Sequence, residues 1–293
     1  MPMRPRIALA TYARAPHLAP DDQLLHRALI AAGADAEPAV WSSDEVMWET
    51  FDAVIVRSCW DYHLRIDEFR DWLDRLDSSR IPTWNTPETV LWNSHKSYLL
   101  DLASRGVPTI PTRIVNRGSA HEVDAIVREE GWTRFVIKPA ISASGYETHA
   151  FATGLEADAR DTIARATAVA DTLVQPFAPE IPRDGELSVI FLDGDFSHAA
   201  IKRASPTEFR VQTEHGGSVA PIDLSSRIVD QASRVIGALS EVPLYARVDG
   251  IVRGDEFLLM ELELIEPNLF LELRDGSADV LARAIMRRMG ALA

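Results

Sequence analysis

Cysteine is nearly absent from this sequence, since Cys59 is the only one. A single cysteine excludes an internal disulfide and a cluster of thiolate metal ligands, and it is typical of a reducing cytoplasm. Long hydrophobic runs are missing too, because none approaches the roughly 20 residues that a transmembrane helix needs. The apolar run from Ile7 to Ala10 is also too short for the core of a signal peptide. The sequence therefore predicts a soluble cytoplasmic protein without a membrane partner.

Positive charge is the second shortage. The 30 Lys and Arg residues are outnumbered by 44 Asp and Glu residues, which gives a formal net charge of -14. A protein that coats nucleic acid needs a basic surface, so this balance argues against a nucleic-acid partner and against an anionic membrane. A few Lys and Arg residues gathered in one cleft would still bind an anionic ligand.

Several familiar signatures of catalysis and nucleotide binding are absent. The sequence has no Walker GxxxxGK[ST] motif, no GxGxxG, no HExxH and no GxSxG. A phosphate-binding loop in this chain would therefore not be a Walker P-loop. With 293 residues, the chain is long enough for a large core and two or three subdomains.

The stretch YARVDGIVRGDEFLLMELELIEPNLF, residues 245–270, predicts two strands joined by a turn. Residues two apart in a strand share a face, so we expect Arg247 beside Asp249, and Glu261 beside Glu263. Carboxylates this close repel each other unless a cation lies between them, which favours a hard cation such as Mg²⁺. The alternative is an edge hairpin with solvated acids.

The N-terminal part alternates strands with helices, which predicts an α/β unit. Four elements are expected: strands over Arg6–Thr11 and Phe51–Arg57, a helix from Asp21 that Gly33 ends, and a helix over Ile66–Leu76. Ligands of such sheets bind beyond the carboxyl ends of the strands, which makes Arg57, Trp60 and Tyr62 candidates for substrate contact. The alternative is that the two aromatic residues belong to the core.

Lys96 is the first candidate for a phosphate contact. Thr86 and Pro87 predict one helix start, and Ser94 predicts a second cap that places Lys96 in the first turn of a helix ended by Gly106. A lysine at a helix N-terminus opposes the macrodipole unless an anion binds there and uses both charges. An exposed solubilising lysine is the alternative.

Lys138 is the second candidate. Within the segment Arg134–Ala140 it follows a predicted apolar strand, and it precedes the small flexible loop Ile141–Tyr146. Backbone N–H groups of such a loop cradle phosphates, and the lysine adds charge; an ordinary surface lysine is the alternative. After a proline-marked linker at 107–112, helices over 122–130 and 156–170 and a strand over 171–177 complete a small α+β unit.

From Glu186 onward the pattern predicts strands again. Asp193-Gly194 is a strong hairpin turn, and Lys202 lies on the strand that follows it. Arg210 precedes a second glycine-containing loop at His215-Gly216-Gly217. Helices are expected over 225–240 and 278–289.

The order and spacing of these features resemble the ATP-grasp superfamily. They are Lys96 on a helix, Lys138 in VIKP before a Ser/Gly loop, the QPF strand, the RVD motif and the Glu-x-Glu strand end. FRVQTEHGG, residues 209–217, resembles the Phe-Arg-x-Asn/Gln…Gly-Gly element of the glutathione synthetase and ribosomal-protein glutamate ligase branch. RSCWDY at 57–62 and LMELELIEPNLF at 259–270 are most similar to the D-cycloserine ligase group, which closes O-ureido-D-serine into the cyclic antibiotic.

The resemblance implies an ATP-grasp fold of α/β and α+β character with three subdomains. These are an N-terminal α/β domain over 1–111, a central lid subdomain over 112–177 and a C-terminal subdomain over 178–293, with the ATP cleft between the last two. The resemblance also implies a role for each candidate residue. Lys96 and Lys138 would contact the ATP phosphates, Ser142, Ser144 and Gly145 would close over them, Gln175 and Phe177 would meet adenine, and Glu186 would hold the ribose or the adjoining lysine.

The remaining candidates would carry the chemistry. Lys202 and Arg210 would face the γ-phosphate and the acyl phosphate, and Arg247 the developing negative charge. Asp249, Glu261 and Glu263 would hold two Mg²⁺ ions. The superfamily commonly ends this motif in Glu-x-Asn, however, so the third metal ligand stays open between Glu263 and Asn268.

The implied function is ATP-dependent carboxylate–amine ligation through an acyl phosphate, with release of ADP and phosphate. The most specific form of this prediction is the cyclisation of O-ureido-D-serine. The candidates for contact with the substrate are Arg57, Trp60, Tyr62 and His215. The partner would be a small-molecule carboxylate that carries an amine-type nitrogen, and the resemblance alone suggests a homodimer. The alternatives are a dipeptide ligase, a ligase that adds amino acids to a protein tail, and a protein that binds nucleotide without turnover.

Overall fold

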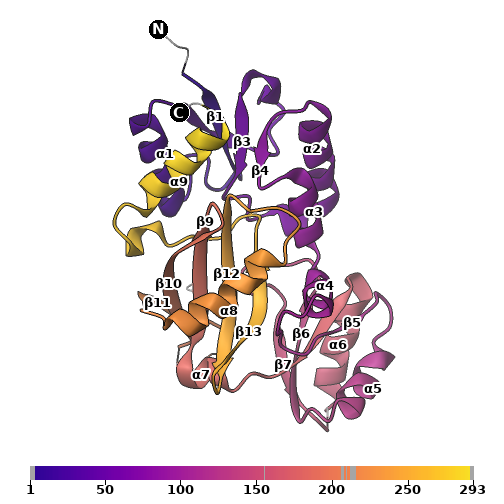
Figure 1. The fold of residues 1–293 in the computed structure, drawn as a ribbon. Helices are drawn as coiled ribbons and strands as arrows, with labels where there is room; N and C mark the ends of the chain where they lie inside the picture. The colour runs from indigo at the N-terminus through magenta and orange to yellow at the C-terminus, as the bar shows by residue number, and fades with distance from the viewer. Residues whose placement is uncertain (1–3, 155, 206–207, 209, 212–215, 291–293) are drawn as a thin grey trace.

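The computed structural model describes residues 4–154, 156–205, 208, 210–211 and 216–290. Over these residues the chain folds into three β-sheets, each with its own helices (Figure 1). The first sheet is parallel, in the order β2-β1-β3-β4. Its elements are β1 (Arg6–Thr11), α1 (Pro20–Ala31), β2 (Asp35–Val40), β3 (Ala53–Val56), α2 (Ile66–Ser78), β4 (Thr83–Trp84), α3 (Pro87–Ser94) and α4 (Tyr98–Ser104).

Helices cover this first sheet on both faces. Ile7 and Leu9 of β1 belong to the core formed with α1, whereas Ala8 and Ala10 belong to the core that holds Trp72 of α2. Successive side chains of a strand point to opposite faces, so an almost uniformly apolar strand is buried on both. The expected α/β unit and its two predicted strands are therefore confirmed.

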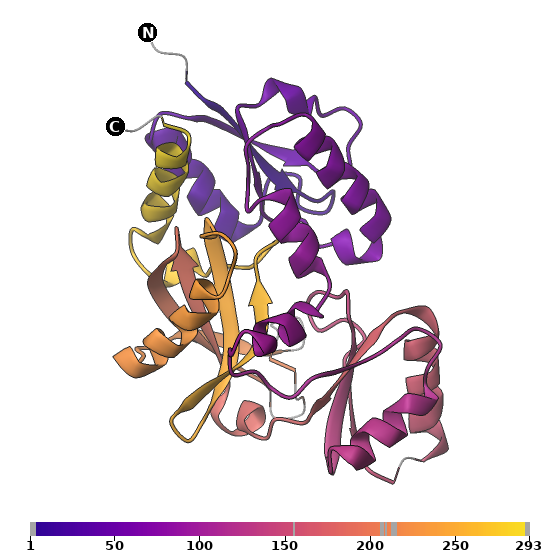
Figure 2. The ribbon, with the colours of Figure 1, turned by 45° about the vertical axis from the view of Figure 1, so that its right-hand side comes forward.

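The second sheet is antiparallel, in the order β5-β8-β6-β7. Figure 2 shows it with its helices at the lower right, beside the body formed by the other two sheets. Its elements are β5 (Arg113–Val115), α5 (His121–Glu129), β6 (Arg134–Pro139), β7 (His149–Ala152), α6 (Ala157–Val169) and β8 (Thr172–Pro176). Val123, Phe135 and Ile163 join one core between sheet and helices. The sequence did not indicate β7, which completes the expected α+β unit.

The third sheet is antiparallel, in the order β11-β10-β9-β12-β13. Its elements are α7 (Glu180–Asp184), β9 (Glu186–Leu192), β10 (Asp195–Arg203), β11 (Ser218–Pro221), α8 (Ser226–Gly237), β12 (Tyr245–Arg253), β13 (Glu256–Glu263) and α9 (Ser277–Arg288). The hairpin turn between β9 and β10 is confirmed at Asp193 and Gly194, whose φ angles of 55° and 85° are the positive values that this turn needs. Ser225 caps α8 by accepting a hydrogen bond from the N–H of Ile228.

Buried asparagines join the first sheet's unit to the third sheet. The Asn93 side chain donates to the carbonyl of Leu262 at 2.8 Å and accepts from the N–H of Leu264 at 2.9 Å. Asn85 likewise bonds the backbone of Leu244, Tyr245 and Leu264. Each sheet lies within one of the three predicted residue ranges, although α9, from the third range, packs against α1 of the first. The division into subdomains itself remains a prediction.

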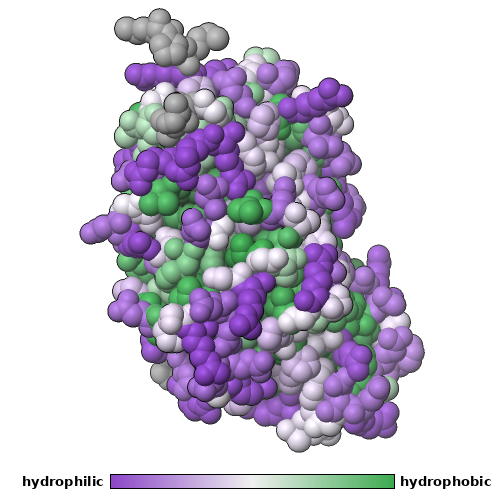
Figure 3. Space-filling model, in the orientation of Figure 1, coloured by the Kyte–Doolittle hydropathy of each residue, from purple (hydrophilic) through white to green (hydrophobic). Residues whose placement is uncertain are grey.

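The outer surface is largely hydrophilic on the face shown in Figure 3. Within the described ranges, no helix combines the length and the apolar character that crossing a membrane demands.

Candidate active site

One pocket lies where the three units meet, and most of the predicted site residues line it. Those that do are Trp60, Tyr62, Lys96, Lys138, Ser142, Ser144, Gly145, Gln175, Phe177, Glu186, Lys202, Arg210, Arg247, Asp249, Glu261, Glu263 and Asn268. They come from all three units, so the pocket exists only in the assembled fold. His215 lies outside the described residues, and Arg57 is discussed below.

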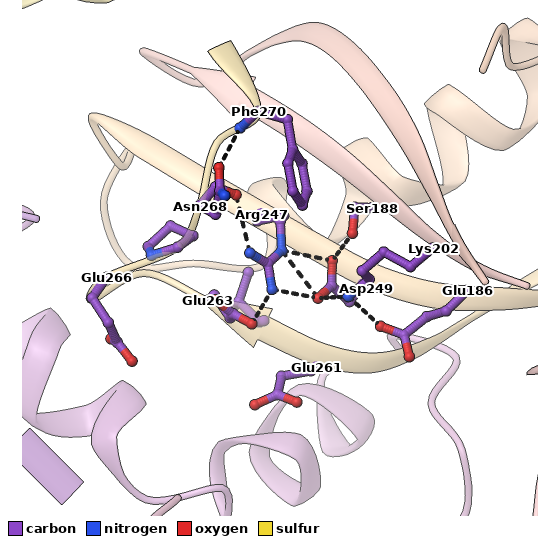
Figure 4. A network of polar contacts seen from close by, with 12 residues as sticks. Glu186, Ser188, Lys202, Arg247, Asp249, Glu261, Glu263, Glu266, Asn268 and Phe270 are labelled. Carbon is purple, nitrogen blue, oxygen red and sulfur yellow. Dashed lines mark hydrogen bonds and ion pairs between the residues drawn. The ribbon is translucent and has the colours of Figure 1, made fainter. Parts of the chain in front are cut away.

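Arg247 is at the centre of a network of ion pairs on β12 (Figure 4). Its guanidinium donates to Asp249 at 2.9 Å, to the carbonyl of Asn268 at 3.0 Å and to Glu263. Arg247 and Asp249 are two apart on β12, and their partners across the hairpin are Glu263 and Glu261. The predicted convergence of one guanidinium and three carboxylates at this end of the hairpin is thereby confirmed.

Lys202 extends this network from β10. Its Nζ lies 2.7 Å from Asp249 and 2.6 Å from Glu186, while Ser188 donates to Asp249 at 2.6 Å. The sheet register explains the meeting, because Lys202 pairs with Glu186 and Asp249 pairs with Ser188 on neighbouring strands.

Burial and charge act against each other in this network. Burial by itself would raise the pKa of Asp249, but the charges of Arg247 and Lys202 hold that pKa well below its usual range. Burial would lower the pKa of Lys202, but Asp249 and Glu186 outweigh it and raise the pKa. Both groups therefore stay charged in a site that largely excludes water.

A second group of charges surrounds Glu261. Lys96 Nζ lies 3.1 Å and Lys138 Nζ 3.9 Å from its two carboxylate oxygens. Burial lowers the pKa of Lys138, whereas at Glu261 the opposing effect of Lys96 and Lys138 outweighs burial and lowers the pKa of the carboxyl. The two lysines thus approach one carboxylate from different units of the fold.

The predicted helical position of Lys96 is wrong. Ser94 is the last residue of α3, where its hydroxyl donates to the Leu91 carbonyl, and α4 begins only at Tyr98. Lys96 lies in the turn between the two helices and is buried. Its Nζ donates to the Ser142 carbonyl at 2.6 Å, so the tertiary contact, and not a helix N-terminus, orients it.

The loop after β6 closes one side of the pocket. Ser142 donates to the Pro139 carbonyl, and Ser144 and Gly145 adopt positive φ angles of 52° and 67°. The ring of Tyr146 lies 5.4 Å from that of His63 in the first unit. That this loop covers phosphates remains a prediction.

The strand end predicted to meet adenine borders the same pocket. The Gln175 side chain is buried and donates to the Thr112 hydroxyl at 2.9 Å, and the Arg134 guanidinium lies 3.8 Å from the Phe177 ring centroid. Arg210 is ion-paired with Glu208 at 2.7 Å. The predicted roles of Gln175, Phe177 and Arg210 stay predictions.

Oxygen donors for the predicted metal site line the pocket, but the described donors are not gathered into a finished site. No group of three or more His, Cys, Asp or Glu side chains in the described part of the chain is already arranged to hold a metal ion. Glu261, Glu263 and Asn268 nevertheless present oxygen donors to the pocket, the kind that Mg²⁺ prefers. Burial raises the pKa of Glu263 to about 7, although the charge of Arg247 opposes the rise. The ionised form of Glu263 is therefore unfavourable unless a further cation binds nearby. The choice between Glu263 and Asn268 stays open.

The substrate side requires one correction. Trp60 and Tyr62 line the pocket, but Arg57 does not: it is buried, donates to Asp22 at 2.7 Å and to the Pro267 carbonyl at 2.8 Å. Its position at the end of a strand suggested ligand contact, yet its guanidinium points into the protein and supports the segment that follows β13.

Glu266 was missed as a site residue. It lines the pocket, and burial together with the nearby Glu263 raises the pKa of its carboxyl to about 8. Glu266 breaks the every-second-residue spacing of Glu261 and Glu263, so periodicity carried no signal for it.

Comparisons with known proteins agree with this geometry. A family model described as "D-cycloserine synthetase DcsG, N-terminal domain" matches residues 7–85. The cycloserine biosynthesis protein DcsG of Streptomyces lavendulae is 31% identical over 276 residues, which cover 88% of this chain and 90% of that protein. The crystal structure of D-cycloserine synthetase DcsG has a TM-score of 0.89 at 28% identity, over 97% of this chain and 99% of that chain.

A more distant structure shows the breadth of the fold. The ATP-grasp ligase PsnB, solved with minimal precursor, Mg and ADP, has a TM-score of 0.64 at 16% identity, over 97% of this chain and 98% of that chain. The fold and the pocket therefore define an ATP-grasp ligase, an enzyme that uses ATP to form a C–N bond. Within that class, the chain belongs to the family of D-cycloserine synthetase DcsG.

Proposed function

We propose that this enzyme is a Mg²⁺-dependent carboxylate–amine ligase that cyclises O-ureido-D-serine to D-cycloserine through an acyl phosphate. The observation that carries the proposal is the gathering of Lys96, Lys138, Lys202 and Arg247 in one pocket of an acidic protein. Such a set of cations suits a reaction in which phosphate groups are held and negative charge develops. The names of the relatives, a cycloserine biosynthesis protein and a D-cycloserine synthetase, support the same product.

The reaction needs no side-chain nucleophile. A carboxylate oxygen of the substrate attacks the γ-phosphorus of ATP, and the bond to the bridging oxygen breaks to release ADP. The substrate nitrogen next to the ether oxygen then attacks the acyl carbon and loses its proton, and phosphate leaves. Water then cleaves the N-carbamoyl bond: the ring nitrogen takes a proton, and the carbamoyl group leaves as carbamic acid, which decomposes to CO2 and ammonia, leaving the five-membered ring product. In this scheme Lys96 and Lys138 hold the phosphates, while Lys202 and Arg247 stabilise the transferred group.

The donor set fits Mg²⁺. Asp249, Glu261 and Glu263, with Asn268 as the alternative third ligand, would hold it, and the ion would neutralise charge on the phosphates. Removal of Mg²⁺ with EDTA is expected to abolish ADP release, and added Mg²⁺ is expected to restore it. Full activity in EDTA would contradict this part of the proposal.

The decisive experiment measures ADP and phosphate release from purified protein with Mg-ATP. One arm contains O-ureido-D-serine, and parallel arms contain the proteinogenic amino acids singly and in pairs. Release stimulated by O-ureido-D-serine alone supports the cyclisation. Release that requires two amino acids would replace it with dipeptide synthesis, and bound ATP with no release in any arm would count against ligation of these substrates.

A further inference from the structure

Glu266 differs from the other acids that line the pocket. Glu186 and Asp249 are paired with Lys202, Glu261 with Lys96, and Glu263 with Arg247. Over the described residues, the carboxylate of Glu266 has no hydrogen bond or ion pair. In Figure 4 it extends on the far side of Glu263, at the opposite end of the row from Glu186. One acidic side chain of the pocket is thus left without a direct partner.

The backbone around Glu266 is held firmly in place. Trp60 Nε1 donates to the Glu266 carbonyl at 3.0 Å, and the Tyr245 hydroxyl donates to the preceding carbonyl of Ile265 at 3.0 Å. Arg57 donates to the following carbonyl of Pro267. These three bonds come from the first and third units, so the direction of the side chain is set by the tertiary structure.

Aromatic residues share the pocket with this carboxylate. Trp60 and Tyr62 line the same pocket, and the Tyr12 ring lies 5.8 Å from that of Trp60. Tyr62 is buried and Trp60 partly so. A pocket that holds both a carboxylate and aromatic rings suits an organic ammonium ion, because the carboxylate accepts its N–H bonds and the rings attract its charge.

We propose that Glu266, with Trp60 and Tyr62 beside it, binds the α-ammonium group of an amino acid substrate. Arg247 and the lysines attract the carboxylate that is to be phosphorylated, and Glu266 lies on the other side of Glu263 from Arg247. An amino acid therefore spans the pocket with its two charged groups at opposite ends. The inference rests on the proposed function, and it names the group by which the site distinguishes α-amino acids from simple carboxylic acids.

The test compares two substrates in two variants. The substrates are O-ureido-D-serine and its analogue without the amino group, 3-(carbamoylaminooxy)propanoate. The variants are Glu266→Gln, which keeps the shape but loses the charge, and the control Glu272→Gln at an exposed position. Glu266→Gln is expected to raise KM for the amino acid about 10- to 150-fold, the range for a hydrogen bond to a charged group. KM for ATP, and all constants for the analogue, should stay unchanged.

Direct binding separates this inference from the proposed function. Calorimetric titration of O-ureido-D-serine and of D-serine into the protein with a non-hydrolysable ATP analogue needs no turnover. If the wild type binds the amino acid without turning it over and Glu266→Gln loses that binding, the ammonium site is supported and the cyclisation is rejected. The role of Glu266 would be overturned if the variant bound the amino acid as well as the wild type, or if the wild type bound no amino acid. It would also be overturned if Glu266→Gln weakened O-ureido-D-serine and its analogue equally, or changed the Mg²⁺ requirement.

Discussion

At the scale of single residues, Arg247 pairs with two of the carboxylates that line the pocket. It bonds Asp249, Glu263 and the carbonyl of Asn268. Burial would lower its pKa, but Asp249 and Glu263 outweigh burial and raise it, so the guanidinium stays charged. Its loss would leave the buried Asp249 and the half-buried Glu263 without this partner, a change that is costly in a site of low dielectric.

Arg247→Ala is expected to lower kcat by about 10²–10³-fold, because one preorganised charge near the reacting group is removed. ATP binding should be largely retained, since Lys96 and Lys138 remain. ADP release and calorimetric titration of ATP measure the two effects. Arg234→Ala, at an exposed position on α8, is the matched control and should behave like the wild type. A kcat in Arg247→Ala close to that of the wild type would refute this role.

At the scale of secondary-structure elements, the β12–β13 hairpin depends on one glycine. The register shifts between Asp249 and Gly250, which lets Asp249 face Glu261 while the next pair is Gly250 with Leu259. A Cβ on Gly250 would lie 2.4 Å from the Leu258 carbonyl oxygen and 2.5 Å from the Phe257 ring. The close approach of the two strands, rather than an unusual φ, therefore requires glycine here.

Gly250→Ala is expected to destabilise the fold by about 1–3 kcal/mol, as overpacking of a core does, and to reduce turnover, because the hairpin carries Asp249 and Glu261. Gly237→Ala is the matched control: it lies in α8 with open space around the new Cβ, and should stabilise by about 0.4–1 kcal/mol. Urea unfolding of both variants measures these changes. Equal stability of the two variants would show that the strand approach is more tolerant than its distances imply.

At the scale of the whole molecule, buried charges join the two ends of the chain. The carboxylate of Asp21 accepts hydrogen bonds from the backbone N–H groups of Leu269 at 2.9 Å and Leu271 at 2.6 Å. Asp22 takes the direct ion pair with Arg57. Two buried carboxylates thus share one guanidinium, and this cluster holds the segment that carries Glu266 and Asn268.

The stability of the fold should consequently depend on pH through Asp21. Burial raises its pKa from 3.8 to about 7 despite the opposing charge of Arg57. The folded state therefore binds this proton more tightly than the unfolded chain. The resulting stabilisation is fully present below pH about 4 and is lost as the pH rises through about 7.

Urea unfolding at intervals from pH 5 to pH 8 measures this effect. The decline in unfolding free energy with rising pH should be shallower in Asp21→Asn than in the wild type. Asp35→Asn, at an exposed position on β2, should keep the wild-type slope. Parallel curves for Asp21→Asn and the wild type would rule out this contribution.

Local patterns in the sequence were enough to predict most helices and strands and most residues of the site. The cap at Thr86, the turn at Asp193-Gly194 and the two-residue spacing of Arg247 and Asp249 depend only on near neighbours, and each appears as expected. The family resemblance then brought distant lysines and acids into one site, and most of the residues it named line one pocket, with Arg57 as the exception among the described ones.

Only the tertiary structure decided the direction of particular side chains. Arg57 supports Pro267 from 210 positions away, and Lys96 is oriented by Ser142 rather than by a helix. Glu266 faces the pocket because Trp60 bonds its carbonyl and Tyr245 bonds the preceding carbonyl of Ile265. Contacts between residues so far apart arise when sheets and helices pack. Periodicity and capping describe only a few neighbouring residues, so they carry no information about which distant partner a buried charge will meet.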